Sequence, residues 1–568
     1  MTSSINALAD RRLLFPSLAI CLSIGILPMA LGMVLSFSHI DPTNSMRWGA
    51  LDGYRYLLSH SAVESFFRIL TRSLIVTVAT ILVSIPISYY IISLKKGKQK
   101  ALLALIAIPW LVNDMLRAFG WQALLAPNGV LYWICNLFFD CGPMYNLRYN
   151  FQAVILGLSS SLLPVGILTI YAAFPSSDKT EWLAVNEYSG PFHAFKMMAI
   201  KRVSRGIMLS CLIVFIMCCF SSAETKFLDG PTQTSIQTIT ASLVNIGVPV
   251  LLSFSTFLVF FMIFLFVIAY LVFAIIFKAK KRNCTTNSLN ELYELDYQNR
   301  SLALCETYVS RALNLFVKVF PAVLSVGALT ICWAPIVMVC AEAFIVNTPM
   351  GAKWTLANFH LFYSSNTMNE AFFNSAVVAC LASILSVWIA FCLSLSYWNK
   401  KYFNVVGSVL IILMFLSGDA YALCFLQSLK LFCQPEGNPI FIILAHTAWI
   451  LPFVTGTLML GNFQINPHIL ESAFEYSKGP LLVIFRYIFR LNFGRLIGAL
   501  FLAATMSLNE YVRSSYLGGS FLTLSNEVHG RLTTGFMAQN REIFVIELIA
   551  VLFSIFSVLL IVKVNKKN

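Results

Sequence analysis

The chain has 568 residues, of which 58% are hydrophobic and only 11% are charged, and its mean hydropathy is +0.78. Soluble globular proteins are about a quarter charged, so this composition excludes a water-soluble enzyme, a disordered scaffold and a secreted disulfide framework. The net charge of +14 can be explained without a nucleic-acid partner, because the cytoplasmic loops of membrane proteins are enriched in lysine and arginine. We therefore predict a protein that lives in the lipid bilayer and binds no nucleic acid.

Apolar runs of about 17–25 residues recur along the chain, and a run of that length can cross a bilayer as a helix. The first run, 13–37, follows Arg11 and Arg12 and has no small-x-small cleavage site after it. It is therefore predicted to be a membrane helix rather than a signal peptide. The other predicted spans are 70–94, 101–125, 151–174, 206–223, 250–277, 315–345, 371–397, 404–429, 438–461, 495–515 and 543–563.

The spans fall into two groups of six, separated by the only sustained polar stretch of the sequence. That stretch, 278–313, contains KAKKRN and TTNSLNELYELDYQNRS and is typical of a linker. The prediction is a first repeat over 1–277, a cytoplasmic linker over 278–313 and a second repeat over 314–568.

Three landmarks recur in the same order in both halves and favour a tandem duplication. SLLPVGI is matched by WILPFVTG, EYSGP by EYSKGP, and AETKFLDG by NEYVRSSYLGG. Six helices return the chain to its starting side, so the two halves run in the same direction. The predicted fold class is an all-α polytopic membrane protein with about 12 transmembrane helices in two parallel six-helix repeats.

Lysine and arginine are concentrated on the side of the membrane that the N-terminus shares, which indicates that this side is cytoplasmic. The basic positions on that side are Arg11 and Arg12, the 95–100 loop, the 175–205 loop, the linker, Lys400 and Lys401, the 462–495 loop and the C-terminal Lys563, Lys566 and Lys567. Both termini are therefore predicted to be cytoplasmic.

Two long inner loops, 175–205 and 462–495, share a pattern. Each combines a short helical stretch, a Gly-Pro break and a basic amphipathic stretch, which predicts a helix–turn–helix at the membrane surface. The residues of the pattern are Glu187, Gly190 and Pro191 in the first loop and Glu475, Gly479 and Pro480 in the second. One interpretation is a connector on lipid headgroups; two copies in matched positions favour a paired docking surface for a symmetric cytoplasmic partner.

Both loops resemble the coupling loop of ABC-importer permeases, whose pattern is approximately E-A-A-x-x-x-G. The second loop keeps Glu471 and Ala473, with Ser472 and Ser477 at the other Ala and the Gly. The first keeps Ala184 and Pro191, with Trp182 at the Glu and Tyr188 at the Gly. The missing glycines depart from the family pattern.

Other stretches resemble the spermidine/putrescine permease pair. LVNDMLRAFGWQALLAPNGVL and AVILGLSSSLLPVGILTIYAAF resemble its first subunit, and WTLANFHLFYSSNTMNEAFFNS, IILAHTAWILPFV and SLNEYVRSSYLGG resemble its second. The resemblance covers most of both halves. It implies a type I ABC importer permease fold in a bacterial inner membrane, with two permease subunits fused in one chain and a polyamine as the substrate.

The same resemblance implies partners. A cytoplasmic ABC ATPase dimer would hold the two loops, and a periplasmic substrate-binding protein would deliver the solute. The chain has no G-x-x-x-x-G-K-[ST] motif, so ATP and Mg²⁺ are expected in separate ATPase subunits and no cofactor is expected in this chain.

Ionisable residues within apolar runs are costly at membrane depth and are therefore candidates for a substrate path. These candidates are Asp114, Arg117, Glu224, Asp419, Glu510 and Arg513. Four carboxylates facing one cavity would suit a polyamine, whose ammonium groups need acceptors. The alternative is internal ion pairing, because Asp114 with Arg117 and Glu510 with Arg513 are spaced i,i+3; Asp419 has no basic neighbour in the sequence.

No catalytic or metal-ligating pattern emerges from the sequence. The seven histidines are isolated, and His446, within an apolar run, is expected to be a hydrogen-bonded core residue. Cys135 and Cys141 fall in one predicted outer loop and are a candidate disulfide. Tryptophans such as Trp110 and Trp449 are expected in the core or at the membrane interface, where a few could contact an ammonium group through their ring faces.

Several functions remain open. Within ABC importers, ferric iron, thiamine and organophosphonates are alternatives to a polyamine. A 12-helix secondary transporter driven by protons or sodium would also have two parallel halves, but would not need two matched coupling loops. A non-transporting membrane assembly subunit is the third class.

Overall fold

The computed structural model describes most of the membrane region. The described residues are 7–40, 46–48, 54–55, 60–126, 129–131, 136–137, 148–174, 203–221, 223–229, 306–348, 351–414, 418–477, 479–534 and 542–567, with single positions between 253 and 264. Several predicted features lie outside these residues: the first inner loop with Ala184, Glu187, Gly190 and Pro191, most of the span 250–277, most of the linker, and Cys135 and Cys141.

In the predicted first half, the main helices follow the predicted spans. They are α2 (Arg11–Cys21), the π-helix η1 (Leu22–Ile26), α3 (Leu27–Leu35), α5 (His60–Ser93), α6 (Lys96–Leu111), α7 (Asp114–Leu124), α9 (Phe151–Ala172), α12 (Ser204–Phe220) and the short α13 (Ala223–Leu228).

The predicted second half repeats this order. Its helices are α17 (Glu306–Glu342), α18 (Ala357–Ser364), α19 (Asn366–Ser394), η5 (Leu395–Trp398), α20 (Lys400–Met414), α21 (Gly418–Lys430), α22 (Pro439–Phe463), α23 (Pro467–Glu475), α24 (Pro480–Val483), η6 (Ile484–Ile488), α25 (Phe489–Leu491), α26 (Phe493–Leu508), α27 (Val512–Leu517), α28 (Leu524–Thr534) and α29 (Glu542–Lys567).

The chain is an all-α polytopic membrane protein. Within the described residues, seven helices are long and apolar enough to cross a membrane, and three bent helix pairs raise the number to ten. Every predicted span except 250–277 coincides with a described helix or bent pair. The last eight residues of the predicted linker, 306–313, form the beginning of α17.

Two predicted spans are sharply bent rather than straight. The run 101–125 divides into α6 and α7 at an angle of 93°, and the run 404–429 divides into α20 and α21 at 99°. In the first, Val112 is extended and the Asn113 side chain accepts a hydrogen bond from the Met115 amide at 2.9 Å, so a new helix starts there. Hydropathy does not reveal this capping signal, because the run stays apolar on both sides of the break.

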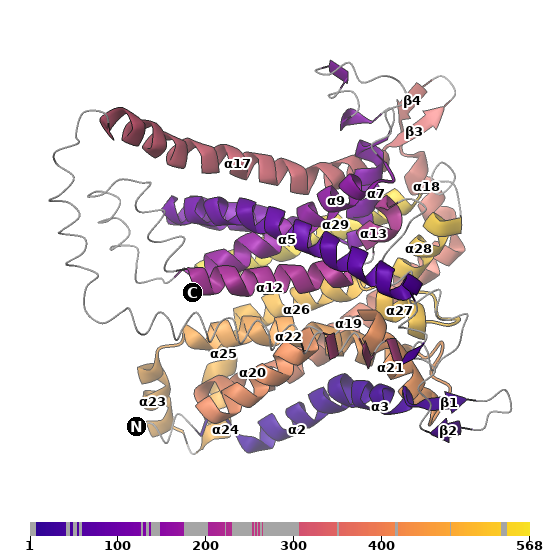
Figure 1. The fold of residues 1–568 in the computed structure, drawn as a ribbon. Coiled ribbons are helices and arrows are strands. Elements are labelled where there is room, and N and C mark those ends of the chain that lie inside the picture. Colours follow the sequence, from indigo (N-terminus) through magenta and orange to yellow (C-terminus); the bar gives the residue numbers. More distant parts are fainter. Residues whose placement is uncertain are drawn as a thin grey trace.

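Each half begins with a helix followed by a two-stranded antiparallel hairpin. α3 leads into β1 (Ser38–Ile40) and β2 (Met46–Trp48), and α17 leads into β3 (Ile345–Thr348) and β4 (Gly351–Trp354). Figure 1 shows both hairpins at one end of the bundle, while α23, the beginning of α2 and the end of α29 lie toward the opposite end.

These two leading helices are exchanged between the halves. α2 and α3 pack against α19 and α21 of the predicted second half, whereas α17 packs against α5, α7 and α9 of the predicted first half as well as against α29 of its own half. The Tyr421 hydroxyl donates to the Ile24 carbonyl at 2.6 Å, and a methyl group on Gly32 would overlap the Cys424 side chain. The halves are therefore joined by close helix packing as well as by the chain.

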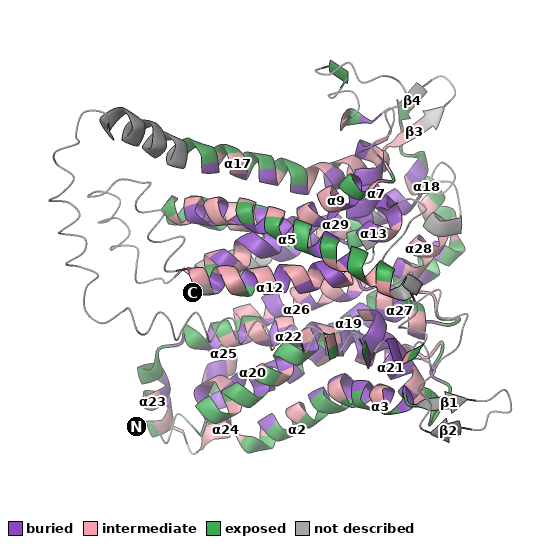
Figure 2. Ribbon diagram, viewed as in Figure 1, coloured by how far each residue is buried: buried purple, intermediate pink, exposed green. Residues whose placement is uncertain are grey.

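The outer helices expose apolar side chains, as a lipid-facing surface requires. Figure 2 shows exposed residues along α2, α5 and α17, while α7 and α13 are largely buried. Only 33% of the apolar window of α17 is buried, against 72% for α9. Leu82, Val323 and Val326 are among the exposed residues of these outer helices.

Candidate functional site

The two halves enclose a cavity of about 250 Å³ where the bent helices meet. Its walls come from α6, α7, α9, α12 and α13 of the first half and from α20, α21, α22, α26 and α27 of the second. Five of the six predicted ionisable residues line it: Asp114, Arg117, Glu224, Glu510 and Arg513. Asp419 is buried next to Gly418, which lines the cavity.

Arg117 holds the break between α6 and α7. Its side chain is buried, and Nη1 donates to the carbonyls of Pro109 at 2.7 Å and Val112 at 2.8 Å. These carbonyls belong to the end of α6, where helical partners run out. A guanidinium with five donors can satisfy several of them at once. The main structural role of Arg117 is therefore to stabilise the bend between α6 and α7.

Nε of Arg117 donates to the Ser161 hydroxyl at 3.1 Å, and Nη2 reaches two carboxylates. Nη2 is hydrogen-bonded to Asp114, which confirms the predicted i,i+3 pair, and lies 3.7 Å from a Glu224 oxygen. Glu224 also accepts hydrogen bonds from the Ser161 and Ser221 hydroxyls, each at 2.5 Å. Glu224 is therefore buried and well satisfied, whereas the Asp114 side chain is 59% exposed at the cavity.

The second half places a similar cluster across the cavity. Arg513 Nη1 lies 2.9 Å from Glu510, which confirms the second i,i+3 pair. The Arg513 guanidinium lies over the rings of Trp449 and Tyr421, 4.7 and 5.4 Å from their centroids. The ring face of Trp449, expected as a possible contact for an ammonium group, is thus used by the protein's own arginine.

Asp419 lies at the edge of this cluster. The Tyr516 hydroxyl, from α27, donates to it at 3.3 Å.

The two clusters have acidic residues at matching places in the order of helices, but their arginines come from helices that do not correspond. Each predicted half has an aspartate at the beginning of the bent half-helix, Asp114 on α7 and Asp419 on α21, and a glutamate after the second long helix that follows, Glu224 after α12 and Glu510 after α26. The arginine comes from α7 in the first half and from α27 in the second. Four carboxylates therefore meet two guanidiniums that the protein itself engages, so the site carries an acidic excess.

Two asparagines that were not predicted join the halves at this cavity. The Asn509 amide donates to the Leu111 carbonyl at 2.6 Å, and the Asn113 amide donates to the Asn509 carbonyl at 3.5 Å. Asn113 follows the end of α6, and this position beside a predicted acid was the available sequence signal. His446 is confirmed as a core residue, hydrogen-bonded to Ser507 and Ser514 at 2.8 and 2.9 Å.

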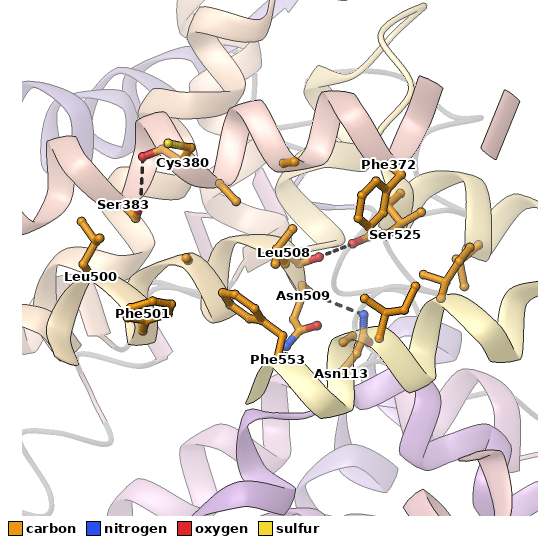
Figure 3. A pocket seen from close by; sticks show the side chains of 18 residues that line it. Asn113, Phe372, Cys380, Ser383, Leu500, Phe501, Leu508, Asn509, Ser525 and Phe553 are labelled. Carbon is orange, nitrogen blue, oxygen red and sulfur yellow. Dashed lines mark hydrogen bonds between the residues drawn. The ribbon is translucent and has the colours of Figure 1, made fainter. Parts of the chain in front are cut away.

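Asn113 and Asn509 also border a second cavity of about 340 Å³, lined mainly by apolar residues of α19, α26, α28 and α29. Figure 3 shows the two asparagines together at this cavity, joined by their hydrogen bond. Its two serines are engaged, since Ser383 donates to the Cys380 carbonyl and Ser525 to the Leu508 carbonyl. No charged residue lines this cavity among the described residues, so it does not share the acidic character of the first.

The second inner loop forms the helix–break–helix that the sequence predicts. α23 carries Glu471 and the buried Ala473 and ends at Glu475. Gly479 follows with φ of 152°, in a region that favours glycine, and α24 begins at Pro480. Glu471 lies 3.1 Å from His468 on the same helix. The loop lies at the end of the bundle away from the hairpins (Figure 1).

Comparison with curated proteins gives partial similarity to bacterial permeases. The spermidine/putrescine transport system permease protein PotB of Escherichia coli K12 is 25% identical over 167 residues, 29% of this chain and 61% of that protein. PotB of Haemophilus influenzae is 25% identical over 197 residues, which are 34% of this chain and 68% of that protein. PotC of Haemophilus influenzae is 21% identical over 243 residues, which are 42% of this chain and 92% of that protein.

The chain is similar to transport-system permeases. The first of these matches spans about 61% of the length of its relative. No protein-family model matches the chain. The similarity supports a permease, and it agrees with the apolar helices in indicating a multi-pass inner-membrane protein.

Proposed function

We propose that this chain is the membrane-spanning permease of an ATP-driven ABC importer, with two permease subunits fused in one polypeptide. Similarity to PotB and PotC proteins supports the permease. The matched order of a leading helix, a hairpin and a bent helix in each predicted half supports the fusion.

A polyamine is the substrate that we propose, and the acidic excess of the cavity carries this proposal. The two guanidiniums are engaged with carboxylates, backbone carbonyls and aromatic rings, so the exposed Asp114 carboxylate remains as an acceptor for a ligand cation. An anionic substrate such as an organophosphonate would meet an acidic surface here and fits less well.

In the proposed orientation the hairpins face outward and α23 faces the cytoplasm. α23 and α24 would then form one docking site for an ATPase subunit, and the loop with Glu187, Gly190 and Pro191 would form the other. A periplasmic substrate-binding protein would dock at the hairpin end. ATP and Mg²⁺ would be bound by the ATPase dimer.

Reconstitution tests the proposed function. The chain, combined in proteoliposomes with a candidate ATPase pair and binding protein, is expected to accumulate labelled spermidine only when ATP is supplied. Uptake driven by a proton or sodium gradient without any ATPase would contradict the ABC mechanism and support a secondary transporter. Accumulation of thiamine or ferric iron in place of spermidine would contradict the polyamine substrate alone.

Asp419→Asn is expected to reduce spermidine uptake about tenfold or more while the protein still assembles. The asparagine carbonyl can keep the hydrogen bond from Tyr516, but the negative charge beside the cavity is lost. Uptake and detergent-solubilised yield are the two measurements. Glu436→Gln, which removes an exposed carboxylate paired with Lys430, is the matched control and should leave uptake unchanged. Equal uptake in the two variants would remove Asp419 from the substrate path.

Glu471→Lys on α23 is expected to lower ATP-dependent uptake severalfold without weakening spermidine binding to the cavity. The side chain is partly exposed at the proposed docking surface, where a reversed charge would oppose the ATPase partner. ATPase co-purification and spermidine binding would be measured together. Glu64→Lys, the same reversal in an exposed pair with Arg68 on α5, is the control. Normal ATPase co-purification with Glu471→Lys would contradict this assignment.

A further inference from the structure

A polar contact between the halves lies beside the acidic cavity and was not anticipated from the sequence. Lys226 on α13 of the first half lies with its Nζ 2.7 Å from Nε2 of His529, which is on α28 of the second half. The Tyr511 hydroxyl lies 2.9 Å from the same ring nitrogen. His529 thus connects a residue of each half.

The chemistry of the two groups determines which of them donates the hydrogen bond. A lysine ammonium can only donate hydrogen bonds, so Nε2 of His529 must accept and the neutral ring carries its proton on Nδ1. Lys226 is partly buried and therefore depends on such acceptors. The contact is a charge-assisted hydrogen bond, stronger than one between neutral groups.

Aromatic packing surrounds this contact. The rings of Tyr511 and His529 stack with centroids 4.2 Å apart, and Phe227 lies between Phe119, at 4.5 Å, and His529, at 6.2 Å. Tyr511 lines the cavity on its other side. Lys226 and His529 therefore lie directly behind a wall of the cavity.

The contact is at the end of the bundle that carries the hairpins. Figure 1 places α13, α27 and α28 toward that end, away from α23. A transporter that alternates its access must separate its halves at this end when it opens outward. Any bond from α13 to α28 must then break.

We propose that Lys226, His529 and Tyr511 form the outer latch of the cavity: while Lys226 is bonded to His529, α13 and α28 stay together and this end of the cavity is closed. The assignment of the latch to the outside rests on the proposed function and its orientation.

Accessibility of the cavity tests the latch without any transport assay. Met414→Cys places a thiol on the cavity wall, and a membrane-impermeant maleimide is applied to right-side-out and to inverted membrane vesicles. Labelling is measured as the increase over the same chain with methionine at 414. Lys226→Met removes the ammonium and keeps an apolar stem, and it should raise outside labelling about tenfold, as loss of one charged hydrogen bond predicts.

His529→Gln is the second variant and should raise outside labelling in the same direction, which guards against a folding defect of one substitution. Lys430→Met is the matched control, because it removes an ammonium from an exposed pair with Glu436; it should label like the parent. Unchanged labelling in both latch variants, or an increase from the cytoplasmic side alone, would overturn the latch. Because this readout needs neither spermidine nor an ATPase, failure of the polyamine proposal would leave its result intact.

Discussion

Arg117→Met is expected to destabilise the protein by about 3–5 kcal/mol, the cost of removing one partner from a buried ion pair. The substitution would leave the carbonyls of Pro109 and Val112 without this donor and would remove the cation beside the buried Glu224 carboxylate. The bend between α6 and α7 should loosen, and thermal unfolding in detergent should occur at a lower temperature.

The control for this variant is Arg68→Met. Arg68 forms an exposed i,i+4 pair with Glu64 at 2.7 Å on α5, and such pairs contribute about 0–1 kcal/mol. Arg117→Lys should be intermediate, because lysine keeps the charge but not the planar fork that reaches several carbonyls. Equal unfolding temperatures for Arg117→Met and Arg68→Met would show that the bend does not depend on Arg117.

Gly120→Ala is expected to destabilise the packing between α7 and the exchanged helix α17 by about 1–3 kcal/mol. A methyl group on Gly120 would overlap the backbone of Pro335, and backbone cannot rotate away as a flexible side chain can. Because α7 carries Asp114 at its beginning, the displacement should also lower spermidine uptake. Unfolding temperature and uptake are the two measurements.

Gly327→Ala provides the opposite result on α17 itself. No atom lies within 4 Å of a methyl group at Gly327, and alanine favours a helix over glycine by about 1 kcal/mol. This variant should be as stable as the parent or slightly more so. If Gly120→Ala were equally harmless, the close approach of α7 and α17 would be contradicted.

The membrane character and the positions of the helices could be predicted because they depend on local apolar runs. The bends could not be predicted from hydropathy, because 101–125 and 404–429 remain apolar across the break. A capping signal was nevertheless present: Asn113 and Asp114 are typical of the beginning of a helix. The i,i+3 pairs of Arg117 and Arg513 were predictable for the same local reason.

Contacts between distant segments were beyond such reasoning. Lys226 and His529 are 303 positions apart, and no periodicity relates them. The carbonyls that Arg117 satisfies become available only because α6 ends at Leu111. Asp419 accepts a hydrogen bond from Tyr516, which is 97 positions away in the sequence. The site was thus predictable as a set of residues but not as an arrangement.

The exchanged leading helices impose an order on biosynthesis. Tyr421, which binds the Ile24 carbonyl, is made 397 residues after its partner. At about 5–20 residues per second, α2 and α3 would wait about 20–80 s in the bilayer before the helices they pack against have been synthesised. During that interval the leading helix lacks its contacts with α19 and α21. Maturation of the first half is therefore completed by the second, and a nascent chain stopped before α21 should remain sensitive to membrane proteases.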